Sequence, residues 1–199
     1  MTTLTALCSD VYELTKRPDL VGETELAVRA ATLKAHQSDY YPKDLYETAI
    51  RFESESYLQS LDYKQIVPQF RALKYLRKYD PSQGNNATGA FLTILSPAEL
   101  LDSYGINRED VAYLAGSSLE IRSKDLLQYI LLGCYVHPVV TSSGYSSWIA
   151  EEHPFFIVFE AARTLFKTIG FDEQAAMYDK LVQEQLILLR MSQITAEGY

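Results

Sequence analysis

Three histidines have the widest chemical range of the residues in this chain. His36, His137 and His153 lie in three different kinds of segment, and none has another His or a Cys at the spacing of metal ligands. An isolated histidine usually faces solvent or makes a single hydrogen bond, and we expect this of all three. The histidines therefore indicate no metal site.

A second group of reactive side chains precedes the C-terminal helices. Glu151, Glu152 and His153 resemble an acid/base set, but neighbouring carboxylates at a helix start point to different sides and are typical first-turn charges. The hydroxyl-rich segment 143–147 has no nucleophile elbow and no nearby base. The sequence contains no phosphate-binding glycine loop and no dinucleotide fingerprint. It thus predicts no catalytic residue, no cofactor and no metal, and a protein that is not an enzyme.

Composition restricts the class of protein. With 199 residues the chain can form one domain, or one domain with a large insertion. A formal net charge of −8 argues against general affinity for nucleic acid or acidic membranes. No basic leader and no apolar run of transmembrane length occur, so we expect a soluble protein made in the cytosol. Cys8 and Cys134 are expected to be small buried hydrophobes in a reducing compartment.

One segment departs from the acidic average. Between Asp62 and Asp80 every charged residue is positive. Lysines that keep an edge strand from unwanted pairing would explain this pattern. A docking face for an acidic partner, or for passing DNA, would also explain it, and this hypothesis predicts Lys74, Arg77 and Lys78 as partner-binding residues. Fifteen tyrosines are consistent with an assembly protein, although half-buried strands also use tyrosine.

Helical periodicity occurs at both ends of the sequence. Apolar residues at steps of three and four predict helices from Leu4 to Leu14 and from Glu23 to Gln37. Toward the C-terminus, two more helices are predicted on either side of Gly170, which ends the first of them. The helix before Gly170 is apolar on most of its circumference, so neighbours must cover it on most sides.

The middle of the chain carries strand patterns and turn residues. Period-two alternation from Leu45 to Phe52 is typical of a half-buried strand. Residues 80–89 are polar and glycine-containing, which predicts a long loop. Ser96–Glu99 is a capping box with proline at the first helical position. Further strands are predicted over residues 70–79, 91–95, 111–114, 119–122 and 128–136, with turns at 116–117 and 123–125.

These patterns predict an α+β fold, in which an antiparallel helical bundle built from both chain ends carries an inserted antiparallel β subdomain. We place the bundle in residues 1–44 and 144–199 and the β-rich subdomain in residues 45–143. Once the bundle is packed, the pattern leaves no sustained apolar seam. The isolated protein is therefore expected to be a monomer or a loose oligomer.

The end of the last helix departs from this pattern. Ile187 lies in the polar stripe and Gln185 in the middle of the apolar face. Residues 191–199 offer no apolar face, which a frayed terminus would explain. Alternatively, residues 191–199 are disordered in the free protein and become ordered against another chain. This second hypothesis predicts partner-binding roles for Gln185, Ile187, Ile194 and Tyr199.

Several stretches resemble the head-to-tail adaptor proteins of tailed bacteriophages, also called connector, head-completion or tail tubular A-like proteins. They are LTKRPDL, ELAVRAATLKAHQSDYYPKDL, LLDSYG followed by YLAGSSLEIRS, GCYVHPVV, and WIAEEHPFFIVFEAARTLFKTIGFDEQAAMYDKLVQEQL. In that family a Trp-Ile pair, a proline, an Ala-Ala pair and a Gly-Asp-type turn recur in this order. The resemblance covers most of the chain and depends on the order of the motifs. The matching residues here are Trp148, Ile149, Pro154, Ala161, Ala162 and Gly170, with Phe171 inserted before Asp172.

The resemblance implies a structural protein of the virion, synthesised in the cytoplasm of the bacterial host. Such adaptors form a ring, usually of twelve copies, below the portal after DNA packaging. The ring completes the head, helps to retain the DNA and provides the platform for the tail. The implied partners are the portal protein, neighbouring adaptor subunits, a tail or nozzle protein, and double-stranded DNA that passes through the lumen without sequence specificity. No membrane is implied, and an acidic lumen would let DNA slide without sticking.

Two other classes remain open. Some podoviral adaptors are also described as cell-wall hydrolases, so a phage-borne peptidoglycan hydrolase with a secondary structural role is the main alternative. It would need two carboxylates that flank a sugar-binding cleft, and nothing in the sequence places Glu151 or Glu120 in this way. A helical scaffold protein of the host is the third class. Zymography on peptidoglycan and co-purification with portal would distinguish the three.

Overall fold

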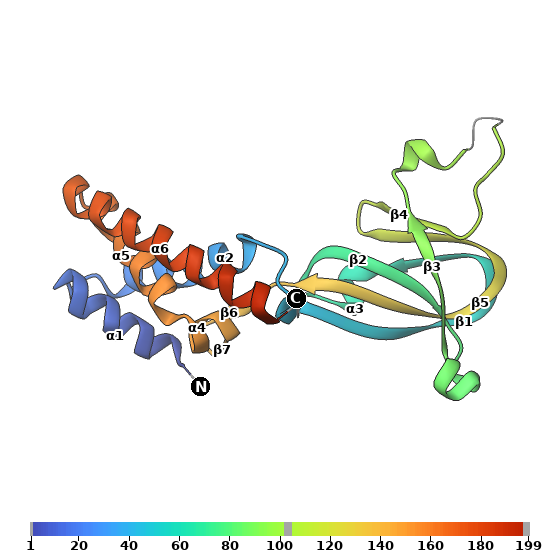
Figure 1. The fold of residues 1–199 in the computed structure, drawn as a ribbon, viewed down its shortest axis with the longest axis horizontal. Coiled ribbons are helices and arrows are strands. Elements are labelled where there is room, and N and C mark those ends of the chain that lie inside the picture. Colours follow the sequence, from blue (N-terminus) through green and yellow to red (C-terminus); the bar gives the residue numbers. More distant parts are fainter. Residues whose placement is uncertain (1, 102–104, 197–199) are drawn as a thin grey trace. The chain divides into compact units, whose positions relative to one another are not determined.

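The computed structural model describes residues 2–101 and 105–196, with the backbone alone for residues 85, 86 and 193–196. The chain groups into two compact units, coloured by sequence in Figure 1. The helical unit comprises Met1–Asp44 and His137–Tyr199, and the β unit comprises Leu45–Val136. Within the described ranges, no helix has the length and apolarity needed to cross a membrane.

The helices predicted near the two chain ends are confirmed. Helix α1 (Leu4–Thr15) ends at Lys16, which adopts a left-handed backbone conformation with a φ of 55°. Helix α5 (Pro154–Thr168) is followed by Gly170, whose φ of 82° favours glycine and ends the helix as predicted. The other elements of the helical unit are α2 (Val21–Gln37), η1 (Pro42–Asp44), β6 (Val139–Thr141), β7 (Gly144–Ser146), α4 (Trp148–Glu152) and α6 (Asp172–Ala196).

Helix α5 is the centre of the helical unit, and it packs against α1, α2 and α6 (Figure 1). Its side chains at Phe156, Ile157 and Ala161 are fully buried, as expected for a helix covered on most sides. Glu160 is also buried, and its Oε1 accepts hydrogen bonds from Lys34 Nζ at 2.7 Å and Arg163 Nη2 at 2.6 Å. These two cations compensate a charge that would otherwise be costly to bury.

The β unit is built around β5 (Ser118–Val136), one strand that pairs with three neighbours. Along one edge it pairs with β1 (Leu45–Asp62). Its other edge pairs with β2 (Phe70–Tyr79) toward the C-terminal end and with β4 (Val111–Ala115) toward the N-terminal end. Strand β3 (Thr88–Ile94) pairs with both β2 and β4, so β5, β2, β3 and β4 form a closed circuit (Figure 1).

This topology corrects the predicted fold. An antiparallel helical bundle with an inserted antiparallel β subdomain is wrong, because β3 and β4 pair in parallel and the sheet closes into a four-stranded barrel with β1 as an additional strand. The hairpin of β6 and β7 also adds strands to the helical unit. The chain mixes α and β structure and is richer in sheet than a bundle with an insert. The physical cause is the length of β5, whose two halves reach different partners and so curl the sheet.

The interior of the barrel is the core of the β unit. Leu76 of β2 and Ile130 and Leu132 of β5 are fully buried there. Leu119 and Ile121 extend the same core along the N-terminal half of β5. Because side chains alternate along a strand, the residues between these positions lie on the other face of the sheet, where Leu131 is also buried.

Several local predictions also change. Residues 123–125, predicted as a turn between two strands, lie within β5, and register shifts on β1 around Ser56 accommodate the bend. The predicted loop over residues 80–89 contains a short 3-10 helix, η2 (Pro81–Asn86), before β3 begins. The capping box at Ser96–Glu99 is confirmed and opens η3 (Pro97–Glu99). The remaining short helix of the β unit is α3 (Tyr63–Ile66).

The C-terminal prediction is wrong for the part that the structure describes. Residues 191–196 continue α6 as a helix up to Ala196, whereas the sequence pattern predicts disorder from Met191. Leu189 is fully buried, and the Ser192 hydroxyl group lies 3.2 Å from His153 Nε2. These contacts hold this part of α6 against the rest of the helical unit. Residues 197–199 lie outside the described residues.

Candidate functional site: interaction surfaces and buried polar clusters

The three basic residues predicted on β2 have different surroundings. The Lys74 ammonium group lies 5.5 Å from the centre of the Tyr135 ring, and the Arg77 guanidinium lies 4.6 Å from the centre of the Phe91 ring. Lys78, in contrast, has a side chain that is only 17% exposed and is held by two carboxylates. Partner binding by these residues stays a prediction, and Lys78 offers the least surface for it.

The outward face of β1, β5 and β2 carries aromatic rings in contact with cations. Arg51 pairs with Tyr129 across β1 and β5, with its guanidinium 5.8 Å from the ring, and Tyr129 lies 6.4 Å from Tyr79. Tyr75 and Phe91 form an edge-to-face pair at 5.7 Å. Arginine and aromatic side chains are enriched at protein interfaces, so this face is a candidate interaction surface. We call it the aromatic face; it comprises Arg51, Lys74, Tyr75, Arg77, Tyr79, Phe91 and Tyr129.

Gly133 makes the centre of the aromatic face possible. It pairs with Glu47 on β1 and with Tyr75 on β2, and a Cβ at this position would lie 2.4 Å from Cζ of Tyr75. The tyrosine ring therefore occupies the space above the glycine, and its hydroxyl group donates to the Glu47 carboxylate. This hydrogen bond raises the pKa of Tyr75, and burial adds to the shift. The contact ties β1 to β2 across β5.

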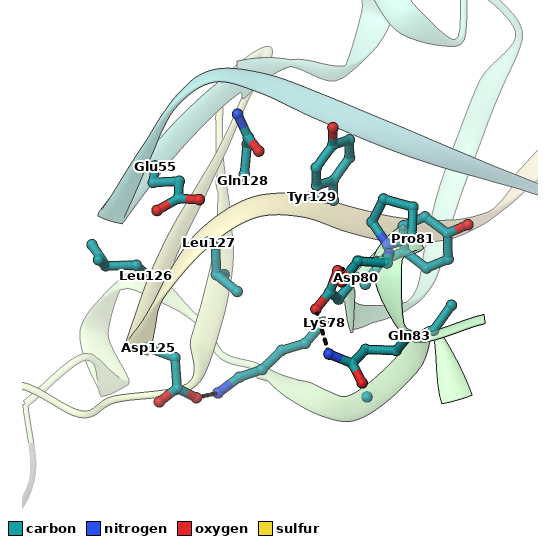
Figure 2. A pocket seen from close by; sticks show the side chains of 14 residues that line it. Glu55, Lys78, Asp80, Pro81, Gln83, Asp125, Leu126, Leu127, Gln128 and Tyr129 are labelled. Carbon is teal, nitrogen blue, oxygen red and sulfur yellow. Dashed lines mark hydrogen bonds and ion pairs between the residues drawn. The ribbon is translucent and has the colours of Figure 1, made fainter. Parts of the chain in front are cut away.

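Lys78 forms an ion-pair cluster at the other end of β2. Its Nζ lies 2.8 Å from Asp110 Oδ1 and 2.6 Å from Asp125 Oδ2, and Figure 2 shows its side chain extended toward Asp125. Burial alone would lower the pKa of Lys78, but the hydrogen bonds to the two carboxylates outweigh it and raise the pKa. Burial likewise opposes ionisation of Asp110, yet the bond from Lys78 and other donors lower its pKa. The cluster is thus an ion pair within the fold.

A cavity of about 700 Å³ lies beside this cluster (Figure 2). At its edge Asp80 accepts hydrogen bonds from the backbone and hydroxyl of Ser82 and from the Gln83 amide, which lower the pKa of Asp80. A glycosidase acid requires a raised pKa, so Asp80 is not set up as a proton donor, and Asp125 is paired with Lys78. The remaining lining residues include Glu55, Tyr79, Pro81, Ala87, Gly89, Leu126, Leu127, Gln128 and Tyr129.

The two carboxylates considered for a hydrolase belong to different units. Glu120 on β5 accepts hydrogen bonds from the hydroxyl groups of Ser60 and Ser118, each at 2.7 Å. Glu151 is an exposed residue of α4 in the helical unit. Neither unit by itself therefore contains both Glu120 and Glu151.

The helical unit contains a buried Asp–His–Ser chain that the sequence did not reveal. His36 Nδ1 lies 2.7 Å from Asp44 Oδ1, and its Nε2 lies 2.9 Å from Ser147 Oγ. Since a carboxylate only accepts, Nδ1 donates to Asp44, and Nε2 is engaged by the serine hydroxyl group. Trp148 also donates its indole N–H to Asp44 Oδ1 at 2.8 Å. The expectation of a solvent-facing or singly bonded histidine is therefore wrong for His36.

The order of groups is that of a catalytic triad, but their surroundings favour a structural role. His36 and Asp44 are almost completely buried. Ser147 Oγ also accepts from the Ala150 N–H at 3.2 Å as the N-cap of α4, so its hydroxyl group has two partners within the fold. A nucleophile needs an accessible carbonyl substrate and nearby oxyanion donors. We interpret the cluster as a connection between α2, η1 and α4; its members are too far apart in sequence to form a recognisable motif.

The remaining reactive groups are also engaged in the fold. Cys8 and Cys134 are buried, free thiols, which confirms their predicted burial, while the reducing compartment stays a prediction. Burial raises the pKa of Cys134 to about 11, so this thiol is protonated at neutral pH. His153 Nε2 lies 3.2 Å from Ser192 Oγ, which joins the start of α5 to α6.

The residues predicted on α6 are placed only in part. Ile187 is exposed and Gln185 is half-buried. The Ile194 side chain and Tyr199 lie outside the described residues. Partner binding by all four stays a prediction.

An exposed stripe follows α6 beside these residues. Its members recur at steps of four and three and therefore share one helix face. Met177, Leu188 and Met191 are 54%, 52% and 59% exposed. The expectation that packing leaves no apolar seam is wrong at these three residues. Packing buries the row with Tyr178, Val182 and Leu189, and leaves a second row that is exposed except at Leu181, which is half-buried against the cluster of Phe166 and Tyr178. We call the other the α6 stripe: Met177, Leu181, Glu184, Leu188 and Met191.

No protein-family model matches this sequence, and a search of curated proteins gives no match either.

Proposed function

We propose that this protein is a head-to-tail adaptor of a tailed bacteriophage. In this role copies of the chain form a ring below the portal, complete the head, help to retain the packaged DNA and provide the attachment platform for the tail. The order of sequence motifs supports the family, whose rings usually contain twelve copies. The proposal makes the protein a binding component of the virion and assigns it no reaction.

The observation that carries the proposal is the α6 stripe. Single exposed apolar side chains are normal on any protein, but a row of them at helical spacing favours contact with another chain. Three members of this row are more than half exposed although α6 packs against α5 along its neighbouring face. A subunit that functions within an assembly has a use for such a surface, whereas an isolated scaffold protein does not.

The use of reactive groups within the fold favours binding over hydrolysis. Asp125 is neutralised by Lys78, Asp80 has a lowered pKa, and Ser147 serves as a helix cap. Each of these side chains therefore stabilises local structure. The two aspartates do so as ionised carboxylates, which cannot donate a proton, and the serine does so as a bonded cap, which is a poor nucleophile. The net charge of −8 is also compatible with a ring through which DNA slides, since like charge prevents tight binding.

The test is direct association with the portal protein encoded by the same genome. Purified chain and portal are mixed and analysed by sedimentation velocity and light scattering, with the portal of an unrelated phage as the control. We expect a complex with one chain for each portal subunit. Absence of a complex, together with clearing of peptidoglycan in a zymogram, would instead favour the hydrolase.

The C-terminal end provides a second arm of this test. A chain that ends at Gln193 should keep its helical circular dichroism, because Tyr178, Val182 and Leu189, which anchor α6, lie before this point. We expect it to lose portal attachment if the last residues contact portal. Attachment with unchanged affinity would remove this segment from the proposed interface and leave the α6 stripe as the candidate.

A further inference from the structure

Helix α2 carries a second stripe, with one exposed and two half-buried residues, on the side opposite its packed face. Its buried positions, such as Val28, Ala31 and Ala35, face the core of the helical unit. On the other side Leu26 is 67% exposed, and Arg29 and Leu33 follow it at steps of three and four. These three residues, the α2 stripe, therefore lie on one outward face.

The α2 stripe and the α6 stripe have the same spacing and opposite charge. On α2 the order is Leu26, Arg29, Leu33, and on α6 it is Leu181, Glu184, Leu188. Each is an apolar, a charged and an apolar residue, at steps of three and then four. Arginine occupies the charged position of one stripe and glutamate that of the other.

The charged residues select one orientation for contact between the stripes. When two helices pack in parallel with this spacing, equivalent positions share a layer, so Arg29 meets Glu184 and leucine meets leucine. In an antiparallel pair, the position of a leucine on one helix faces the position of the charged residue on the other, so each charge would face a leucine. Parallel contact therefore satisfies both charges and covers both pairs of leucines.

The interactions that Arg29 and Glu184 make within one chain do not prevent contact between the two stripes. Arg29 lies 3.7 Å from Glu25 in an i,i+4 pair whose side chains are 38% and 37% exposed, and such surface pairs are worth little. Glu184 is exposed, as is Leu188. Leu33 is half-buried, and Leu181 is half-buried against the cluster of Phe166 and Tyr178. Both stripes thus keep exposed surface for another copy, mainly at Leu26, Glu184 and Leu188.

We infer that the α6 stripe of one copy binds the α2 stripe of the next copy, in parallel, with Glu184 paired to Arg29. Two different surfaces on each copy make a heterologous contact, which extends from copy to copy and closes where the rotation allows. The inference rests on the proposed function for its setting in a ring. The contact itself requires only copies of this chain.

Cross-linking of the full-length chain tests the contact. A Leu26→Cys/Leu181→Cys variant is treated with a short bismaleimide, and covalent species are separated on a denaturing gel. We expect a ladder of multimers, because each copy then links to two neighbours. The native thiols are buried, so the wild type serves as the background control. Dimers from Leu181→Cys alone, at the yield of the double variant, would show an α6–α6 contact and overturn the inference.

Charge exchange tests the register. Either Arg29→Glu or Glu184→Arg, added to the cross-linking variant, should lower the ladder yield about fivefold to tenfold, as expected for loss of one interfacial charge pair. The two exchanges together should restore the yield. Failure of this restoration overturns the pairing of Arg29 with Glu184.

Portal association, measured separately, keeps the two proposals apart. A chain that binds portal without forming a ladder on it refutes the α2–α6 contact and leaves the adaptor proposal intact. A ladder without portal association supports the contact and argues against the adaptor.

Discussion

The helical unit and the β unit use their polar side chains in opposite ways. In the helical unit the residues best suited to chemistry, His36, Asp44 and Ser147, are buried and bonded to one another, while leucine and methionine side chains form stripes on the surface. In the β unit the apolar side chains fill the barrel, and cations and aromatic rings cover its outward face.

This contrast shows that the type of a residue does not identify a site. A serine, histidine and aspartate in triad order act here as a connection between helices, because they are buried and bonded to one another and so give no access to a substrate. A lysine in a basic run acts as an internal ion pair. The surfaces open to a partner are those whose side chains make few contacts within their own unit. On α6 these side chains are mainly apolar.

The largest expected effect is at the buried cluster. Replacement of His36 by Ala removes the hydrogen bonds to Asp44 and Ser147, and should cost about 3 kcal/mol because a buried carboxylate loses a partner. Fluorescence of Trp148, the only tryptophan in the chain, reports on this cluster during urea unfolding. Ser147→Ala is the matched control and should cost only about 1 kcal/mol, the value of a helix cap. A cost below about 0.5 kcal/mol for His36→Ala would contradict the structural role.

The next prediction compares the loss of stability on substitution of two lysines of β2, Lys78 and Lys74. Lys78→Met removes both ion pairs of a largely buried side chain and should lower the stability of the β unit by about 1 to 2 kcal/mol. Lys74→Met removes an exposed cation above a ring and should stay within about 0.5 kcal/mol. Hydrogen exchange of amides in β2 and β5 measures the β unit separately from Trp148. Equal effects at the two positions would mean that the Lys78 cluster adds nothing to the fold.

A smaller effect is expected at Gly133. An alanine there collides with the Tyr75 ring, which must move and release Glu47, at a cost of about 1 kcal/mol. In a Tyr75→Ala background the same change should cost less, because the space is then empty. Hydrogen exchange in β1 and β5 of the four variants gives this coupling. Additive costs would show that the ring and the glycine act independently.

Local signals explain why the helices could be predicted from the sequence. The end of α5 at Gly170 and the capping box at Ser96–Glu99 depend on residues a few positions apart, and both are found as predicted. The closure of the barrel depends on pairs between distant strands, such as Thr93 with Val111, and no short pattern encodes them. Polar residues at 123–125 indicate a turn, but Asp110 binds Ser123 and the Lys124 N–H there, so the strand continues.

The candidate surfaces were predictable only in part for the same reason. The basic character of β2 is a local property, yet the engagement of Lys78 depends on Asp110 and Asp125, which arrive from later segments. On α6 the sequence predicts one apolar face with no seam to spare, and only the packing against α5 shows which of its residues stay exposed. The cluster of His36 and Ser147 joins residues from the two ends of the chain, beyond any motif.

The smallest expected effect is a dependence of stability on pH in the β unit. The pKa of Asp110 is lowered in the folded protein, because hydrogen bonds from Lys78 and the Lys124 N–H outweigh the opposing effect of burial. A carboxyl group of this kind stabilises the fold above its unfolded pKa, which is near 3.8, and the stabilisation is lost as pH falls through the folded value. With a side chain 38% exposed, the contribution is screened and should stay below about 1 kcal/mol.

Comparison of Asp110→Asn with the wild type isolates this contribution from that of other carboxylates, such as Asp80, whose pKa is also lowered. Between pH 7 and 5 the wild-type β unit should exceed the variant in stability by a constant margin, and the margin should shrink below about pH 4. Hydrogen exchange and urea midpoints over this range measure it, while Trp148 fluorescence follows the helical unit, which should show no difference between the two proteins. A margin that grows on acidification would mean that Asp110 is stabilised in its protonated form. The Lys78 cluster would then be a weak surface contact instead of an ion pair within the fold, and the contrast between Lys78 and Lys74 would disappear with it.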